Sequence, residues 1–203
     1  MDILHKIEVT QKIQEAKRKQ LKKLDLSGAL MSEKRLTEIP DEVFKLEHLE
    51  ILDLKYNALS DIPDATAQLH NLTSLTLSVN KLTTFPNAIA QLRNLKSLNL
   101  NGNKISSLPD LIVQLRNLTS LRLVNNRLTN LGEWIAHLHD LTSLDLGGNL
   151  LTALPDKISE LSNLVSLNLN GNRLTTIPDT IGQLHNLTSL SLSVNQLTMR
   201  MTS

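Results

Sequence analysis

The sequence contains no cysteine, and its aromatic residues are one Trp, one Tyr and two Phe among 203 residues. Without cysteine there is no disulfide framework, no Cys-ligated zinc site and no thiol nucleophile. Aromatic side chains normally supply much of a compact core, so their scarcity argues against a conventional globular core. No apolar run is long enough to span a membrane, and the start, MDILHKIEVT, has no secretory signal pattern. We therefore expect a soluble, cytoplasmic protein.

A strong charge of either sign is also missing, because the 21 basic and 20 acidic residues leave a net charge of +1. This balance argues against electrostatic capture of nucleic acid or of an anionic membrane. One basic run extends from Lys17 to Lys23 and has two interpretations. It is either a nuclear-import or anionic-surface patch, or the polar outer face of a helix whose charge Glu8 and Glu15 dilute. Because no aromatic platform accompanies the basic residues, we expect no nucleic-acid partner.

Leucine, in contrast, is abundant, with 45 of 203 residues, and most of it follows a period of 23 residues. The unit is L-x-x-L-x-L-x-x-N-x-L-x-x-φ-P-x-x-φ-x-x-L-x-x, where φ is apolar. A fixed period of this length predicts a stack of similar supersecondary units. The asparagines that mark the period are Asn57, Asn80, Asn103, Asn126, Asn149, Asn172 and Asn195.

Each part of the unit predicts a local structure. Leucines that alternate with polar residues in L-x-L predict a half-buried strand. A proline followed by Asp or Asn, as at Pro86 and Pro109, favours a helix N-terminus. Because one unit cannot bury its leucines alone, we expect the units to stack with parallel strands about 4.8 Å apart. An asparagine amide both donates and accepts, so we expect the asparagines to bridge successive turns.

The repeat unit resembles the leucine-rich repeat family over residues 21–198. The resemblance implies an α/β fold, namely a right-handed solenoid of about eight repeats with a parallel sheet on the concave side and short helices on the convex side. The L-P-x-x-I form is similar to the 23-residue intracellular class of Ras-group and LAP-type scaffolds. Residues 13–18 and 24–28 are similar to the opening of bacterial repeat proteins, some of which belong to the Roco family.

The two ends depart from the repeat. Residues 1–20 carry Ile3, Ile7, Val9, Ile13 and Ala16 at helical spacing, which predicts an amphipathic cap helix. About five additional residues lie around 29–35 and predict a small loop. Residues 199–203 form an uncapped tail, so the last strand would expose a sheet edge and part of the leucine core. We favour a fragment of a longer protein; a partner or self-association covering this end is the alternative.

Motifs for catalysis are absent from the sequence. It has no G-x-x-x-x-G-K-[ST] phosphate loop, no H-E-x-x-H and no calcium-binding loop. His70, His139 and His185 share one repeat position, but two or more repeats separate them, which is too far to ligate one metal ion. We expect no enzymatic activity, no metal and no cofactor. The sequons at Asn71, Asn117 and Asn186 also share one repeat position, so the repeat explains them more simply than glycosylation does.

Residues that alternate with the strand leucines must point into the concavity, where the resemblance implies that partner proteins bind. Two of them, Tyr56 and Arg122, are large and belong to the types that dominate interface energies. We expect both to be anchors; the alternative, that neither touches a partner, stays open. The candidate partner-binding residues are Ile51, Asp53, Lys55, Tyr56, Thr76, Val79, Asn99, Asn101, Arg122, Val124, Asp145 and Asn168.

Two further features vary between repeats. Gly132 replaces the proline of one unit, and Trp134 follows it, either to anchor a partner or to fill the gap left by the changed turn. A basic column directly after the asparagines, with Lys81, Lys104, Arg127 and Arg173 and an interruption at Leu150, would bias the rim of the solenoid toward acidic partners.

These patterns together predict a non-enzymatic, cytoplasmic scaffold or adaptor in signalling, whose concave face binds another protein. The alternative is the N-terminal regulatory repeat region of a larger Roco-type GTPase or other multidomain signalling protein. A phosphate loop downstream of Ser203 would favour the second hypothesis. The identity of the partner, the pathway and the oligomeric state cannot be read from the sequence.

Overall fold

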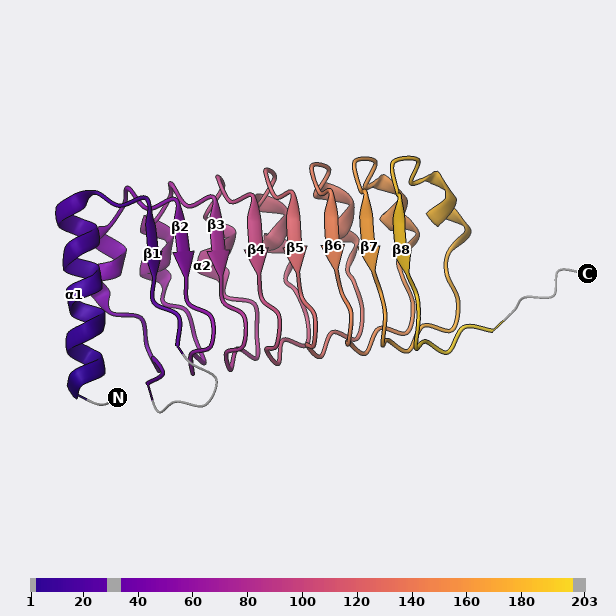
Figure 1. The fold of residues 1–203 in the computed structure, drawn as a ribbon. Helices are drawn as coiled ribbons and strands as arrows, with labels where there is room; N and C mark the ends of the chain where they lie inside the picture. The colour runs from indigo at the N-terminus through magenta and orange to yellow at the C-terminus, as the bar shows by residue number, and fades with distance from the viewer. Residues whose placement is uncertain (1–2, 29–33, 199–203) are drawn as a thin grey trace, which may run out of the picture.

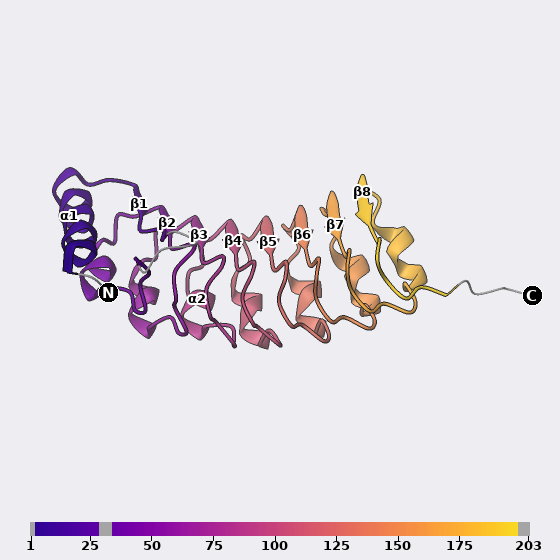
Figure 2. The same ribbon diagram turned by 60° about the horizontal axis from the view of Figure 1, so that its bottom comes forward.

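The computed structural model describes residues 3–28 and 34–198 of the chain. They form a right-handed solenoid in which one layer of parallel strands is backed by short helices, with helix α1 at one end (Figure 1). Figure 2 shows the strands along the hollow side of a shallow arc and the short helices along its outer side. The strands pair in chain order as one eight-stranded sheet. They are β1 (Lys23–Asp25), β2 (Ile51–Asp53), β3 (Ser74–Thr76), β4 (Ser97–Asn99), β5 (Ser120–Arg122), β6 (Ser143–Asp145), β7 (Ser166–Asn168) and β8 (Ser189–Ser191).

The strand register repeats the 23-residue period from β2 onward. Ser74 pairs with Ser97, which pairs with Ser120, and the central leucines pair in the same way. Between β1 and β2 the step is longer, since Lys23 pairs with Ile51. The additional residues of this first repeat fall around the predicted loop at 29–35, of which residues 29–33 lie outside the described part.

The leucines fill a single continuous core between the sheet and the short helices. The central leucines of β2 to β7 are at most 1% exposed. Full burial of one leucine side chain contributes about 1.5–3 kcal/mol, so stacking this one residue type replaces the missing aromatic core. At the last strand the burial weakens, because Leu190 in β8 is 40% exposed and Leu197 is 42% exposed.

The periodic asparagines form a hydrogen-bonded ladder along the core, as the sequence predicts. The Asn126 side chain shows the pattern: its Oδ1 accepts from the N–H of Ile105 at 3.0 Å, and its Nδ2 donates to the carbonyls of Leu100 and Leu123, both at 3.0 Å. Asn126 is 7% exposed. Because buried backbone groups must find partners, each asparagine satisfies the turn of its own repeat and ties it to the preceding one.

The outer side consists of short helices that begin after the prolines. Most are single 3-10 turns with an acidic residue in the first turn, a position that stabilises a helix N-terminus. They are η1 (Asp41–Lys45), η2 (Asp64–Gln68), α2 (Asn87–Ala90), η3 (Asp110–Gln114), η4 (Glu133–His137), η5 (Asp156–Glu160) and η6 (Asp179–Gln183).

Helix α1 (Ile3–Lys19) lies against the first repeat at the end of the solenoid (Figure 1). Val9, Ile13 and Ala16 are buried in the core, at helical spacing. The expectation that Ile7 shares this packed face is wrong, since Ile7 is 49% exposed. Since an α-helix turns by about 100° per residue, Ile7 lies about 200° around the helix axis from Val9, on the opposite face. The side chain of Ile3 and the predicted tail at 199–203 lie outside the described residues.

Candidate functional site

The strand register arranges the candidate residues of the concave face into four columns. The first column is the first strand position, which holds Ile51 in β2 and a serine in each later strand, from Ser74 to Ser189. The other columns are the third strand position, the second residue after the strand, and the residue that follows it. In that order they hold Asp53, Thr76, Asn99, Arg122, Asp145 and Asn168; then Lys55, Asn101 and Val124; then Tyr56 and Val79.

Most acidic and amide side chains of the third column bind the backbone of their own turn. Asp53 Oδ1 accepts from the Lys55 N–H at 3.0 Å, and Asn99 Oδ1 accepts from the Asn101 N–H at 3.0 Å. Asn168 Oδ1 accepts likewise from Asn170, and Asp145 Oδ1 accepts at 3.4 Å from Gly147. The sequence analysis predicts these side chains only as partner contacts. The known preference of Asp and Asn for such turns is the sequence signal that predicts their hydrogen bonds to the backbone.

Neighbouring repeats are also joined through two of the candidate amides. Asn101 Oδ1 accepts from the N–H of Val124 in the next repeat at 2.8 Å, and Asn168 Nδ2 donates to Asp145 Oδ1 at 2.8 Å. These bonds hold the side chains in fixed positions on the face. Each keeps part of its hydrogen-bonding capacity for a partner, because a carboxylate or amide oxygen has two lone pairs.

The N-terminal third of the face carries a charged cluster. Lys55 Nζ lies 3.3 Å from Asp53 Oδ2, and the hydrogen bond and charge of Asp53 raise the pKa of Lys55. Burial raises the pKa of Asp25. Hydrogen bonds from the side chain and the N–H of Ser27 lower it, as do the charges of Lys12 and Lys55, and together they outweigh burial, so the pKa of Asp25 is lowered. The raised pKa keeps Lys55 protonated beside Asp53 near neutral pH.

Arg122 lies in the middle of the face and is exposed. Its backbone pairs with Asn99 on one side and Asp145 on the other. Within residues 3–28 and 34–198 its guanidinium forms no salt bridge or side-chain hydrogen bond, whereas Lys55 is paired. Its five N–H donors are thus available to an acidic or carbonyl group outside the molecule. The half-buried Val124 lies beside it.

Tyr56 and Val79 occupy the turn at the end of the strand rather than the strand itself. Their φ angles are +59° and +56°, and the same column holds Gly102, Gly148 and Gly171 at +65° to +67°. This left-handed conformation costs a non-glycine residue about 1–2 kcal/mol. Tyr56 is half-buried at the rim of the face, and Ile51, 39% exposed, lies at the opposite end of β2. Ile51 and Tyr56 therefore lie at opposite ends of the same strand.

Trp134 lies on the outer side and is only 4% exposed. A Cβ at Gly132 would lie 2.5 Å from the indole Cδ1, so the ring occupies the space beside the glycine that replaces the proline. This placement favours the gap-filling interpretation over a surface anchor.

The sequon asparagines form a second ladder along one edge of the solenoid. Asn71, Asn117 and Asn186 each donate Nδ2 to a carbonyl of the preceding repeat, at 2.7–2.8 Å. Asn94 and Asn163 do the same at 2.9 Å. At the equivalent position Asp140 has no amide to donate. The shared hydrogen bond gives these asparagines a structural role.

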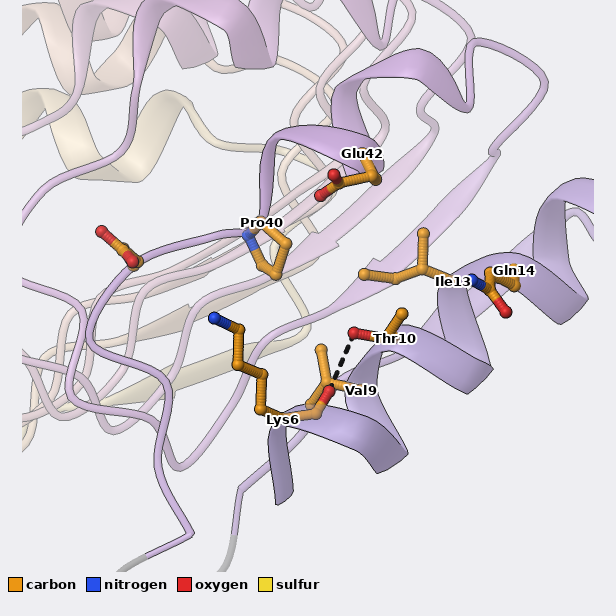
Figure 3. A pocket seen from close by; sticks show the side chains of 8 residues that line it. Lys6, Val9, Thr10, Ile13, Gln14, Pro40 and Glu42 are labelled. Atoms are coloured by element: carbon orange, nitrogen blue, oxygen red, sulfur yellow. Dashed lines mark hydrogen bonds between the residues drawn. The ribbon is translucent and has the colours of Figure 1, made fainter. Parts of the chain in front are cut away.

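A groove of about 380 Å³ lies between α1 and η1 (Figure 3). Val9, Ile13 and Pro40 form its apolar part, and Lys6 and Glu42 stand at its rim. Thr10 closes one side and donates its hydroxyl to the Lys6 carbonyl at 2.9 Å. None of its lining residues is a histidine or a cysteine. The lining offers a hydrophobic contact with a charged rim rather than a pair of groups set up for catalysis.

Two further features concern residues 3–28 and 34–198. No group of three His, Cys, Asp or Glu side chains there is placed to hold a metal ion. No helix among these residues has the length and apolar character needed to cross a membrane.

Family models match nearly the whole chain. A model for a leucine-rich repeat region matches residues 10–125, and further leucine-rich repeat models match residues 139–197 and 116–161. A comparison with curated proteins found no match.

Several solved structures are similar to this chain. A leucine-rich-repeat protein of Leptospira interrogans is 35% identical, with a TM-score of 0.70, over 90% of this chain and 51% of the other. An internalin from Listeria monocytogenes is 31% identical, with a TM-score of 0.70, over 80% and 46%. A plant peptide hormone receptor, RGFR1 in complex with RGF2, is 36% identical, with a TM-score of 0.71, over 79% and 27%. The chain thus spans about half the length of the first two structures.

Proposed function

Because this chain belongs to the leucine-rich repeat family, we propose that it binds a partner polypeptide on the concave face of its sheet. The observation that carries the proposal is the open face itself, which none of the described elements covers (Figure 1). It presents fixed polar side chains, the ordered pair of Asp53 and Lys55, and the unpaired Arg122.

Complexes of similar proteins support a polypeptide as the ligand. The plant receptor was solved with RGF2, and a second plant receptor ectodomain, from Arabidopsis thaliana, was solved with CASPARIAN STRIP INTEGRITY FACTOR 2. The polar and narrow character of the present face fits an extended segment, since the columns run across successive strands about 4.8 Å apart.

Within this surface, Tyr56 and Arg122 are the proposed anchors. Arg122 supplies a guanidinium in the centre, and Tyr56 supplies a half-buried ring at the rim. Truncation of an interface anchor typically costs about 1–3 kcal/mol, and a tenfold loss of affinity corresponds to about 1.4 kcal/mol, in the lower half of that range.

The absence of cysteine gives a direct test. A single cysteine in place of Arg122 carries a photo-crosslinker on the concave face, and one in place of the exposed Arg116 carries it outside that face. We expect a discrete crosslinked polypeptide from position 122 and none from position 116. We also expect Tyr56→Ala and Arg122→Ala to weaken capture of that polypeptide about tenfold, with Arg116→Ala as the unaffected control. Equal crosslinking from both positions would refute the assignment.

The cellular setting that we propose is a cytoplasmic scaffold or adaptor in signalling. A second candidate is the regulatory repeat region of a Roco-type GTPase or other multidomain signalling protein. It is favoured because this chain covers only about half of the longer Leptospira and Listeria proteins to which it is similar. The complete reading frame distinguishes the two, because a G-x-x-x-x-G-K-[ST] motif after Ser203 belongs only to the GTPase.

Self-association through β8 is a further part of this proposal. Leu190, Val194 and Leu197 are 40%, 82% and 42% exposed, and exposed strand edges with apolar residues promote pairing. Sedimentation over a hundredfold concentration range tests it. A single monomeric species throughout would contradict self-association and leave the concave-face proposal standing.

A further inference from the structure

A column of cations lies on the flank of the solenoid, directly after the asparagine ladder. We call it the basic column; it consists of Lys81, Lys104, Arg127 and Arg173, with Leu150 as an interruption. All four cationic residues are exposed. The N–H of Lys104 donates to the Leu82 carbonyl at 2.8 Å, and that of Arg127 donates to the Ile105 carbonyl at 2.9 Å. These bonds hold successive members of the basic column on adjacent repeats (the rungs of the solenoid), about 4.8 Å apart.

The exposed positions that follow the cations of the basic column are uncharged. Two and three positions after the cations, the chain exposes Thr83 and Thr84, Ser106 and Ser107, and Thr129 with Asn130. These side chains can donate hydrogen bonds and carry no charge. Across the residues that the structure describes, none of the four cations forms a salt bridge. By repeat position, the acids closest to the column are Asp61, which aligns with Thr84 one repeat before Lys81, and those that begin the outer helices, such as Asp110 six residues after Lys104.

Such an arrangement is unfavourable for the isolated protein. Exposed like charges on adjacent repeats repel each other, and Lys104 has a cation on both sides. We propose that the basic column binds an extended acidic segment of a partner polypeptide, whose carboxylates neutralise Lys81, Lys104 and Arg127 while the neighbouring hydroxyls donate hydrogen bonds.

The geometry favours a polypeptide over nucleic acid. The three consecutive cations span two rungs, about 10 Å. Alternate residues of an extended peptide lie about 6.6 Å apart, so two or three carboxylates on one side of the peptide cover that length. Single-stranded nucleic acid relies on aromatic stacking platforms, and the exposed residues of this strip include no aromatic side chain: the nearby Phe85 is only 5% exposed.

Binding of a fluorescein-labelled decamer of glutamate, measured by anisotropy at low ionic strength and again at 0.3 M NaCl, tests the site. We expect salt-sensitive binding by the wild type and at least a tenfold loss in the triple variant K81Q/K104Q/R127Q. The matched control, R93Q/K96Q/R116Q, removes the same number of charges from exposed positions elsewhere and is expected to lose less than threefold. Equal losses in the two variants, or no binding by the wild type, would overturn the proposal.

Two additional measurements separate the basic column from alternatives. Lys104→Gln is expected to raise the melting temperature of the free protein at low salt, and this gain is expected to vanish at 1 M NaCl, because the repulsion is then screened. No gain at low salt would remove the physical basis of the site. An oligo-dT decamer that binds more tightly than the glutamate decamer would assign the column to nucleic acid instead.

Discussion

Replacement of Asn126 by alanine tests the hydrogen-bonded ladder. The amide of Asn126 serves one N–H and two carbonyls, those of Ile105, Leu100 and Leu123. Alanine leaves the N–H of Ile105 without a partner, at a position that is 7% exposed, whereas the carbonyls of Leu100 and Leu123 each keep one amide donor, from Asn103 and Asn149. A buried polar group left without a partner costs about 1–3 kcal/mol, and each of the two other lost hydrogen bonds costs about 0.5–1.5 kcal/mol. We therefore expect a loss of about 3–5 kcal/mol in the free energy of unfolding, although almost no apolar area is removed.

Asn117→Ala is the matched control for this experiment. Asn117 makes one side-chain hydrogen bond, to the Arg93 carbonyl at 2.8 Å, and is exposed, so water replaces the lost amide. We expect a loss of about 0.5–1 kcal/mol.

Urea unfolding followed by circular dichroism and by the fluorescence of the single, buried Trp134 gives the two free energies. With a slope of about 2–3 kcal/mol per molar urea, the midpoint falls by about 1–2 M for Asn126→Ala and by less than about 0.5 M for Asn117→Ala. Equal midpoints for the two variants would refute the energetic role of the buried ladder.

Four other substitutions test separate parts of the fold by the same unfolding measurement. Leu121→Ala, at a fully buried core position, is expected to cost about 2–5 kcal/mol, and near-neutral stability would contradict the stacking. Gly171→Ala places a side chain at φ +67° and is expected to cost about 1–2 kcal/mol. Gly182→Ala, in η6 with open space around it, is expected to be neutral or to stabilise by up to about 1 kcal/mol. The same sign of the stability change for both variants would be inconsistent with backbone strain at Gly171. Asp140→Asn restores a donor to the second asparagine ladder and is expected to stabilise by about 0.5–1 kcal/mol, and a loss of stability would argue against that ladder.

The period predicts the strands, their parallel stacking and the asparagine ladder because each depends on contacts that recur identically. Asn126 and its equivalents have the same neighbours in every repeat, so one physical argument covers all of them. The open face was equally predictable, since alternation alone decides which side chains of Ser120–Arg122 point away from the core.

The features that the sequence leaves open depend on single residues. The turn formed by Asp53 and the N–H of Lys55 needs a backbone geometry that appears only once the strand is seen to end there. Tyr56 lies in a left-handed turn, and only its alignment with Gly102 in the 23-residue period signals that conformation. For Trp134, sequence position does not distinguish a buried ring from an exposed one, because the turn at Gly132 sets the available space.

The constant register of β2 to β8 makes the length of this molecule adjustable in whole units. If one complete repeat were excised, Ser74 would meet Ser120 in place of Ser97, and a serine would again lie beside a serine. Recombination between like positions of the gene would therefore lengthen or shorten the rod by one rung and leave every remaining interface intact. Loss of a single residue, by contrast, would turn the leucines of the altered rung away from those of its neighbours.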